Sequence, residues 1–138
     1  MKERKELVFC VLLIVYILFL LFFAVISREP KDNYIARLDL FWSYSNPSGN
    51  GYRDVFLNLL SFIPIGIMAG LIEKEHRIGK AMLLGFLVSI VIELSQLIWS
   101  RGFFDVDDLF NNVVGALFGA LMVICVVNIR KKAITKRI

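Results

Sequence analysis

The sequence predicts an all-α integral membrane protein, a four-helix bundle with little chain outside the bilayer. Two observations predict this fold class. The 138 residues are 58% hydrophobic and only 20% charged, whereas a soluble domain is about 45–50% apolar. The apolar residues also gather into four blocks, each close to the roughly 20 residues that a helix needs to cross the hydrocarbon core. The blocks are residues 7–26, 55–72, 81–99 and 109–127.

The four blocks differ in the polar residues that interrupt them. The first carries no charge, is longer than the apolar core of a signal peptide, and is followed by no small-x-small cleavage pattern. We therefore expect it to be a retained helix. With so little chain left over, residues 1–138 are expected to form a single transmembrane domain. The polar residues in the other three blocks include Asn58, Glu93, Gln96, Asn111 and Asn112.

Lysine and arginine predict the orientation, because they resist transfer across the membrane. Eleven of the 16 lie in the N-terminal segment, the second loop and the C-terminal tail, against five in the first and third loops. We therefore expect both termini in the cytoplasm. The net charge of +4 then favours anionic lipid on the inner leaflet. Nucleic acid is not an expected partner, because the basic residues are divided over three short juxtamembrane segments.

The long first loop, residues 27–54, is then extracytoplasmic and has room for structure of its own. Apolar residues recur in it at helical spacing, which indicates a short helix lying in the membrane interface. Two interpretations stay open: a tether held by aromatic side chains at the headgroups, or a lid over a site. The apolar residues at helical spacing are Ile35, Leu38, Phe41 and Trp42.

Glycines predict close packing between the second and fourth blocks. Gly66 and Gly70 are four residues apart and so share a helix face, as do Gly115 and Gly119. Small residues at this spacing let two membrane helices approach closely. The sequence therefore predicts a compact bundle.

Polar side chains from three helices are expected at one depth, on the outer side. Glu93 lies roughly 9 Å inside the outer end of the third block, at 1.5 Å per residue. A carboxylate at this depth costs several kcal/mol unless it is paired, hydrated or protonated, so we expect Arg53 or Arg101 to neutralise it. The predicted ligand-binding residues are Arg53, Asn58, Glu93, Gln96, Arg101, Asp105, Asp108 and Asn112.

Several kinds of chemistry are not expected from these residues. The one histidine, His76, lies in the second loop, away from the cluster, which argues against a histidine-assisted nucleophile or a histidine-ligated metal. Asp105, Asp107 and Asp108 offer oxygen ligands but lack the spacing and glycine of an EF-hand. We therefore predict no metal and no other cofactor. Two arginines near the headgroups instead suit a phosphate, which guanidinium binds through two parallel hydrogen bonds.

A longer pattern of these residues resembles the VanZ-like family. The resemblance covers residues 53–121 and includes the four-span layout. It implies a multi-pass protein of the bacterial cell membrane, associated with resistance to the lipoglycopeptide teicoplanin. The pattern reads Arg53-x4-Asn58, Phe62-Ile63-Pro64-Ile65-Gly66, Glu93-x-x-Gln96 and Arg101-x3-Asp105-x-Asp107-Asp108-x3-Asn112-x-x-Gly115-x3-Gly119.

Three functions stay open at this point. The leading one is a binding site for an anionic amphiphile of the outer leaflet: a lipid phosphate, a lipid-linked wall precursor or a lipoglycopeptide. The second is an enzyme that modifies an envelope lipid, with Glu93 or Asp108 as the catalytic acid or base. The third is a scaffold for a wall-synthesis complex, as a monomer or a homodimer, in which the polar residues only join helices.

Overall fold

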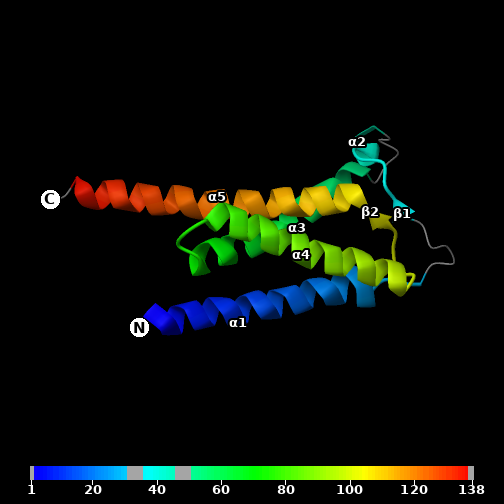
Figure 1. The fold of residues 1–138 in the computed structure, drawn as a ribbon, viewed down its shortest axis with the longest axis horizontal. Coiled ribbons are helices and arrows are strands. Elements are labelled where there is room, and N and C mark those ends of the chain that lie inside the picture. The colour runs from blue at the N-terminus through cyan, green and yellow to red at the C-terminus, as the bar shows by residue number, and fades with distance from the viewer. Residues whose placement is uncertain (1, 31–35, 46–50, 137–138) are drawn as a thin grey trace.

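The computed structural model describes residues 2–30, 36–45 and 51–136, and four long helices dominate it (Figure 1). Each is long and apolar enough to cross a membrane, which confirms the predicted all-α fold with four spans. The first span combines an α-helix with a terminal π-helix. The helices are α1 (Lys2–Leu21), η1 (Phe22–Ile26), α3 (Gly51–Ile72), α4 (Arg77–Ile98) and α5 (Val106–Thr135).

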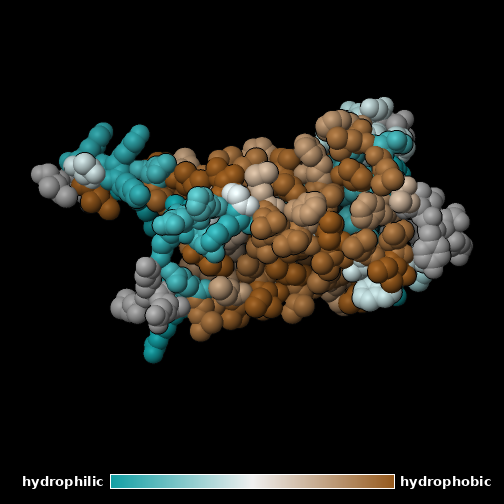
Figure 2. All heavy atoms as spheres, viewed as in Figure 1, coloured by the Kyte–Doolittle hydropathy of each residue, from teal (hydrophilic) through white to brown (hydrophobic). Residues whose placement is uncertain are grey.

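The two ends of the bundle differ in what they carry (Figure 1). Both chain termini lie at one end, which we call the termini end. The opposite end carries α2 (Trp42–Ser45) and a short parallel pair of strands, β1 (Ala36–Arg37) and β2 (Phe104–Asp105), and we call it the loop end. Apolar side chains cover the middle of the face that Figure 2 shows, and all four long helices carry exposed apolar residues. Such a belt matches a bilayer, so the chain is a multi-pass membrane protein.

Helices α3 and α5 form the most closely packed pair, and their glycines are the reason. A Cβ atom on Gly66 would collide with the backbone of Ala116, and one on Gly115 would collide with the carbonyl of Leu59. Helix backbones can approach this closely only where the side chain is absent. The predicted close packing of the two glycine pairs is confirmed.

Helix α1 packs on the outside of this core. Its C-terminal part and η1 contribute Leu20 and Val25 to an apolar cluster with Phe62 of α3 and Ile92 of α4. The hydroxyl of Tyr16 donates a hydrogen bond of 2.8 Å to a carbonyl of α3. Most other α1 side chains are exposed on the apolar belt.

The first loop differs from the predicted interfacial helix. The strand β1 pairs Ala36 with Phe104 and Arg37 with Asp105, and the helix that follows, α2, is a single turn. Between them Phe41 adopts a left-handed conformation with φ 67°, which is uncommon for a bulky residue. Pairing with β2 thus outweighs the helical spacing of the apolar residues. Ile35, part of the predicted helix, lies outside the described residues.

Candidate ligand-binding site

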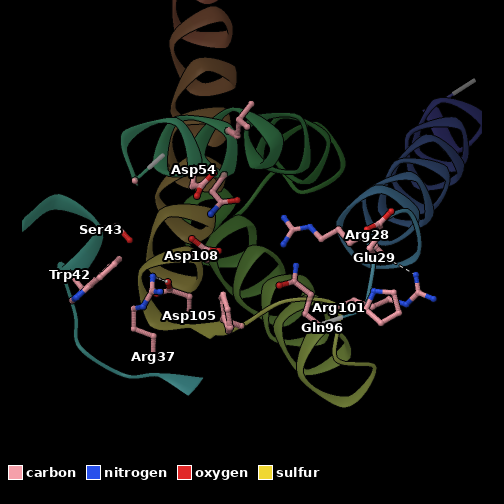
Figure 3. A pocket seen from close by; sticks show the side chains of 15 residues that line it. Arg28, Glu29, Arg37, Trp42, Ser43, Asp54, Gln96, Arg101, Asp105 and Asp108 are labelled. Carbon is pink, nitrogen blue, oxygen red and sulfur yellow. Dashed lines mark hydrogen bonds and ion pairs between the residues drawn. The ribbon is translucent and has the colours of Figure 1, made fainter. Parts of the chain in front are cut away.

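A polar cavity of about 670 Å³ opens at the loop end (Figure 3). The C-terminal end of η1, the first turns of α3 and α5, the last turn of α4 and the segment around α2 surround it. Its volume lies in the range of small-molecule sites, roughly 300–1,000 Å³. Five of the eight predicted site residues line it: Asn58, Gln96, Arg101, Asp105 and Asp108.

The other three predicted residues lie beside the cavity. Glu93 is 1% exposed and is covered by the backbone of Asp105, whose N–H donates to its carboxylate at 2.9 Å. Asn112 is 3% exposed and donates to the hydroxyl of Ser89 at 2.8 Å. Arg53 is exposed on the first turn of α3. The sequence pattern thus points to the end of the bundle at which the cavity lies, but it does not separate lining residues from supporting ones.

Of the described residues that line the cavity, ten were not among the predicted ones, and four of these ten are charged: Arg28, Glu29, Arg37 and Asp54. A sequence signal existed for Arg28, which follows the first apolar block directly and so had to lie at the same end. Asp54 shares a helix face with Asn58, four residues on. No local pattern indicated Arg37, because its place depends on the strand pairing at the loop end.

Neither arginine expected to neutralise Glu93 does so. Arg101 donates to two backbone carbonyls, those of Ile26 and Arg28, at 2.6 Å each. It therefore ties the α4–β2 loop to the end of η1. Arg53 is exposed.

Arg37 and Asp105 form an ion pair on the wall of the cavity. The guanidinium contacts the carboxylate at 3.0 Å and lies 3.8 Å from the ring centre of Trp42. Burial raises the pKa of Asp105 above the usual aspartate value, while the backbone N–H of Asp107 and the charge of Arg37 oppose that rise. The side chain of Asp105 also caps α5 by accepting this N–H at 2.9 Å. One carboxylate thus joins the first loop to the start of a membrane helix.

Asp107 fixes the segment around α2. Its carboxylate is fully buried and accepts the backbone N–H groups of Phe41 and Ser43, the latter at 2.8 Å. The hydroxyl of Tyr44 also donates to the side-chain oxygen of Asn111 on α5. The described segment around α2 is therefore held on α5 at one wall of the cavity.

Several polar groups that face the cavity are not used by the fold. The side-chain amide nitrogen of Asn58 is buried and has no hydrogen-bond partner within residues 2–30, 36–45 and 51–136. The carboxylates of Asp54 and Asp108 line the same cavity as the guanidinium of Arg28. In the same described ranges, no ion pair joins Arg28 to either carboxylate. Burying a polar group without a hydrogen-bond partner costs free energy. A ligand that binds these groups would remove that cost.

Arg37→Gln is expected to destabilise the protein increasingly as the pH rises. The variant loses a charge that lowers the pKa of Asp105, so this pKa rises further. A raised folded-state pKa contributes stability that is fully present below the unfolded value, about 3.9, and is lost as the pH passes the folded value. The loss relative to wild type should grow from near zero at about pH 4 to about 1–2 kcal/mol at about pH 8.

Unfolding in detergent at several pH values measures this difference. Arg53→Gln is the matched control, because it removes an exposed arginine of the same end. A loss that is the same at every pH would contradict the proposed coupling between Arg37 and Asp105.

The chain is similar to a known protein family. The model of the VanZ/LLP1 family matches residues 7–128, which include most of each of the four spans and every described residue of the cavity wall. This match confirms the resemblance inferred from the polar pattern. No curated protein and no solved structure matches the chain.

Proposed function

This chain belongs to the VanZ/LLP1 family, and we propose that it is a bacterial cell-membrane protein whose cavity binds an amphiphile of the outer leaflet. The proposed ligand has an anionic group in its head, as in a lipid phosphate, a lipid-linked wall precursor or a lipoglycopeptide such as teicoplanin. The loop end then faces outward and both termini face the cytoplasm, in agreement with the distribution of lysine and arginine.

One observation carries the proposal: a polar cavity lined by arginines lies at the end of an apolar belt. A headgroup in the cavity would keep its charge at the membrane surface, where guanidinium binds phosphate well. The apolar side chains of Leu57 and Phe103 line the same cavity. Leu57 is also exposed on α3, so an acyl chain has an apolar path from the cavity to the lipid.

The proposed ligand contacts follow from the lining. Glu93 and Asn112 are proposed to support the cavity wall from behind. Arg53 is proposed to contribute only to the electrostatic potential near the opening of the cavity. Arg101 is proposed to hold the wall through its bonds to two backbone carbonyls. The residues proposed to contact the ligand are Arg28, Asn58, Gln96, Asp105 and Asp108.

A second function, modification of the bound lipid, depends on Asp108. This carboxylate lines the cavity, and no hydrogen bond to it is found in the described parts of the chain. A general base must reach the proton that it takes from the substrate. Glu93 is buried behind the backbone of Asp105, so Asp108 is the better candidate of the two predicted bases.

Arg28→Ala is expected to lower the amount of anionic amphiphile that stays bound during purification. Loss of a charge-assisted hydrogen bond of about 1.5–3 kcal/mol corresponds to at least about tenfold weaker binding. Native mass spectrometry of the full chain, released from mild detergent, measures the bound fraction. Teicoplanin and phosphatidylglycerol serve as added probes.

Arg53→Ala is the matched control, because Arg53 is an exposed arginine at the same end that does not line the cavity. It should keep most of the bound amphiphile. Equal losses in the two variants would indicate only general attraction by positive charge. Retention of no amphiphile by the wild type would refute the binding function.

A further inference from the structure

The charges on the cavity wall do not suit a ligand that is only anionic. Among the described residues, three arginines and four carboxylates line the cavity, and Glu93 lies directly behind the wall. A lone phosphate would therefore meet carboxyl groups as well as guanidinium groups. The lining carboxylates are Glu29, Asp54, Asp105 and Asp108.

Two of the three arginines are already used by the fold. Arg37 is paired with Asp105 and stacked on Trp42. Arg101 donates to two backbone carbonyls. Arg28 is left, and Figure 3 shows its guanidinium extending from the end of η1 into the cavity. Among the described residues of the cavity wall, one cation is thus available to bind a phosphate.

The opposite wall holds two carboxylates in the first turns of adjacent helices. Asp54 belongs to α3 and Asp108 to α5, and both side chains line the cavity. In Figure 3 both carboxylates lie across the cavity from the end of η1, where the Arg28 side chain begins. Two neighbouring carboxylates are stabilised by a cation placed between them. A primary ammonium group has the size and the three donors for that position.

Asn58 supplies the remaining contact. Its buried amide nitrogen is a donor without a partner within the residues that the structure describes, and its side chain lines the cavity. It lies one helical turn deeper in α3 than Asp54. A phosphate oxygen would accept from this nitrogen, whereas an ammonium group offers no acceptor. The cavity therefore presents donors for a phosphate and, separately, acceptors for an amine.

We propose that the cavity binds a headgroup that carries both a phosphate and a primary amine, the chemistry of phosphoethanolamine. Arg28 and the amide nitrogen of Asn58 bind the phosphate, and Asp54 and Asp108 bind the ammonium group. This inference rests on the proposed function and narrows its ligand from anionic to zwitterionic. The same chemistry occurs in a membrane lipid and in a soluble phosphate ester.

The test compares lipids that share a phosphate but differ in the amine. The full chain in detergent is titrated with phosphatidylethanolamine, its N-acetylated derivative and phosphatidylglycerol, and binding is measured by native mass spectrometry. We expect the amine-bearing lipid to bind about tenfold more tightly than either of the others, the usual value of one charge-assisted contact. Equal or tighter binding of phosphatidylglycerol overturns the inference but leaves the proposed function standing. Binding of none of the three overturns both.

Variants assign the preference to the two carboxylates. Asp54→Asn should bring the ratio of the affinities for phosphatidylethanolamine and phosphatidylglycerol close to one. Binding of phosphatidylglycerol itself should be kept or improved. Asp54 is exposed, so this substitution leaves folding intact, and Asp108→Asn is the companion variant. Asp39→Asn, an exposed aspartate at the same end that does not line the cavity, should keep the full preference. A preference that survives in Asp54→Asn and Asp108→Asn overturns the inference.

Soluble phosphoethanolamine distinguishes the two sources of this chemistry. If it binds the lipid-free protein and displaces the bound lipid, the headgroup alone is recognised and a soluble ester is a natural ligand. If the lipid binds and the soluble ester does not, the acyl chain is part of recognition and the ligand is a membrane lipid. In either case, the ligand that carries the primary amine must bind more tightly than its counterpart without the amine. The inference is overturned if neither the lipid nor the soluble ester shows this preference.

Discussion

Gly119→Ala is expected to prevent stable packing of α3 against α5, although it adds only one methyl group. A Cβ atom at this position would collide with the carbonyl of Ile63 and would lie 2.7 Å from the nitrogen of Ile67. These are helix-backbone atoms, which cannot rotate away as a side chain can. The helices must separate, and we expect a loss of at least about 3 kcal/mol, the upper range for overpacking.

Gly79→Ala is the matched control, because a Cβ atom there has no neighbour within 4 Å. Alanine in an open helical position should be neutral or stabilising by up to about 1 kcal/mol. Unfolding in detergent, followed by circular dichroism, compares the two variants with wild type. Similar stability of Gly119→Ala and wild type would show that the helices are not in such close contact.

Asp107→Ala is expected to release the segment around α2 from α5. The fully buried carboxylate accepts two backbone N–H groups, and its removal leaves both donors without that acceptor. Each unsatisfied buried donor costs about 1–3 kcal/mol, so we expect a loss of about 2–5 kcal/mol together with weaker ligand binding. The left-handed conformation of Phe41 should also relax, because the bond to Asp107 helps to hold it.

Hydrogen exchange of the amides of Phe41 and Ser43 measures this release directly. Both should exchange faster in Asp107→Ala, while amides in the middle of α3 stay protected. Asp107→Asn should give an intermediate result, because its single side-chain oxygen can accept only part of the original pair of bonds. Unchanged protection at Phe41 and Ser43 would contradict the role given to Asp107.

The membrane helices were predictable from the sequence because the bilayer constrains them strongly. A span must be apolar over about 20 residues and must satisfy its own backbone, and the blocks at 55–72 and 81–99 match α3 and α4 to within four residues at each end. The glycine faces were predictable for a similar reason, since close approach of Gly66 and Gly119 to another backbone requires the missing side chain. The polar residues gave the end of the bundle at which the cavity lies.

The cavity wall was less predictable because it depends on contacts between distant parts of the chain. Arg37 meets Asp105 across 68 positions, and only the pairing of β1 with β2 brings them together. Arg101 was expected to neutralise a carboxylate but binds backbone carbonyls left open where η1 ends. Helix ends leave such carbonyls without partners, and sequence alone does not tell which side chain will reach them.

The peripheral place of α1 has a consequence for how the protein is made. Its surface is apolar on nearly all sides. It can therefore move from the insertion machinery into the lipid by itself, as soon as it has been synthesised. The later helices carry Asn58, Glu93 and Asn112, and each of these side chains is buried or half-buried near the neighbouring helices. A helix with such a residue is costly in lipid by itself. We therefore expect the last three helices to enter the bilayer as a group and then to assemble against a first helix that is already there.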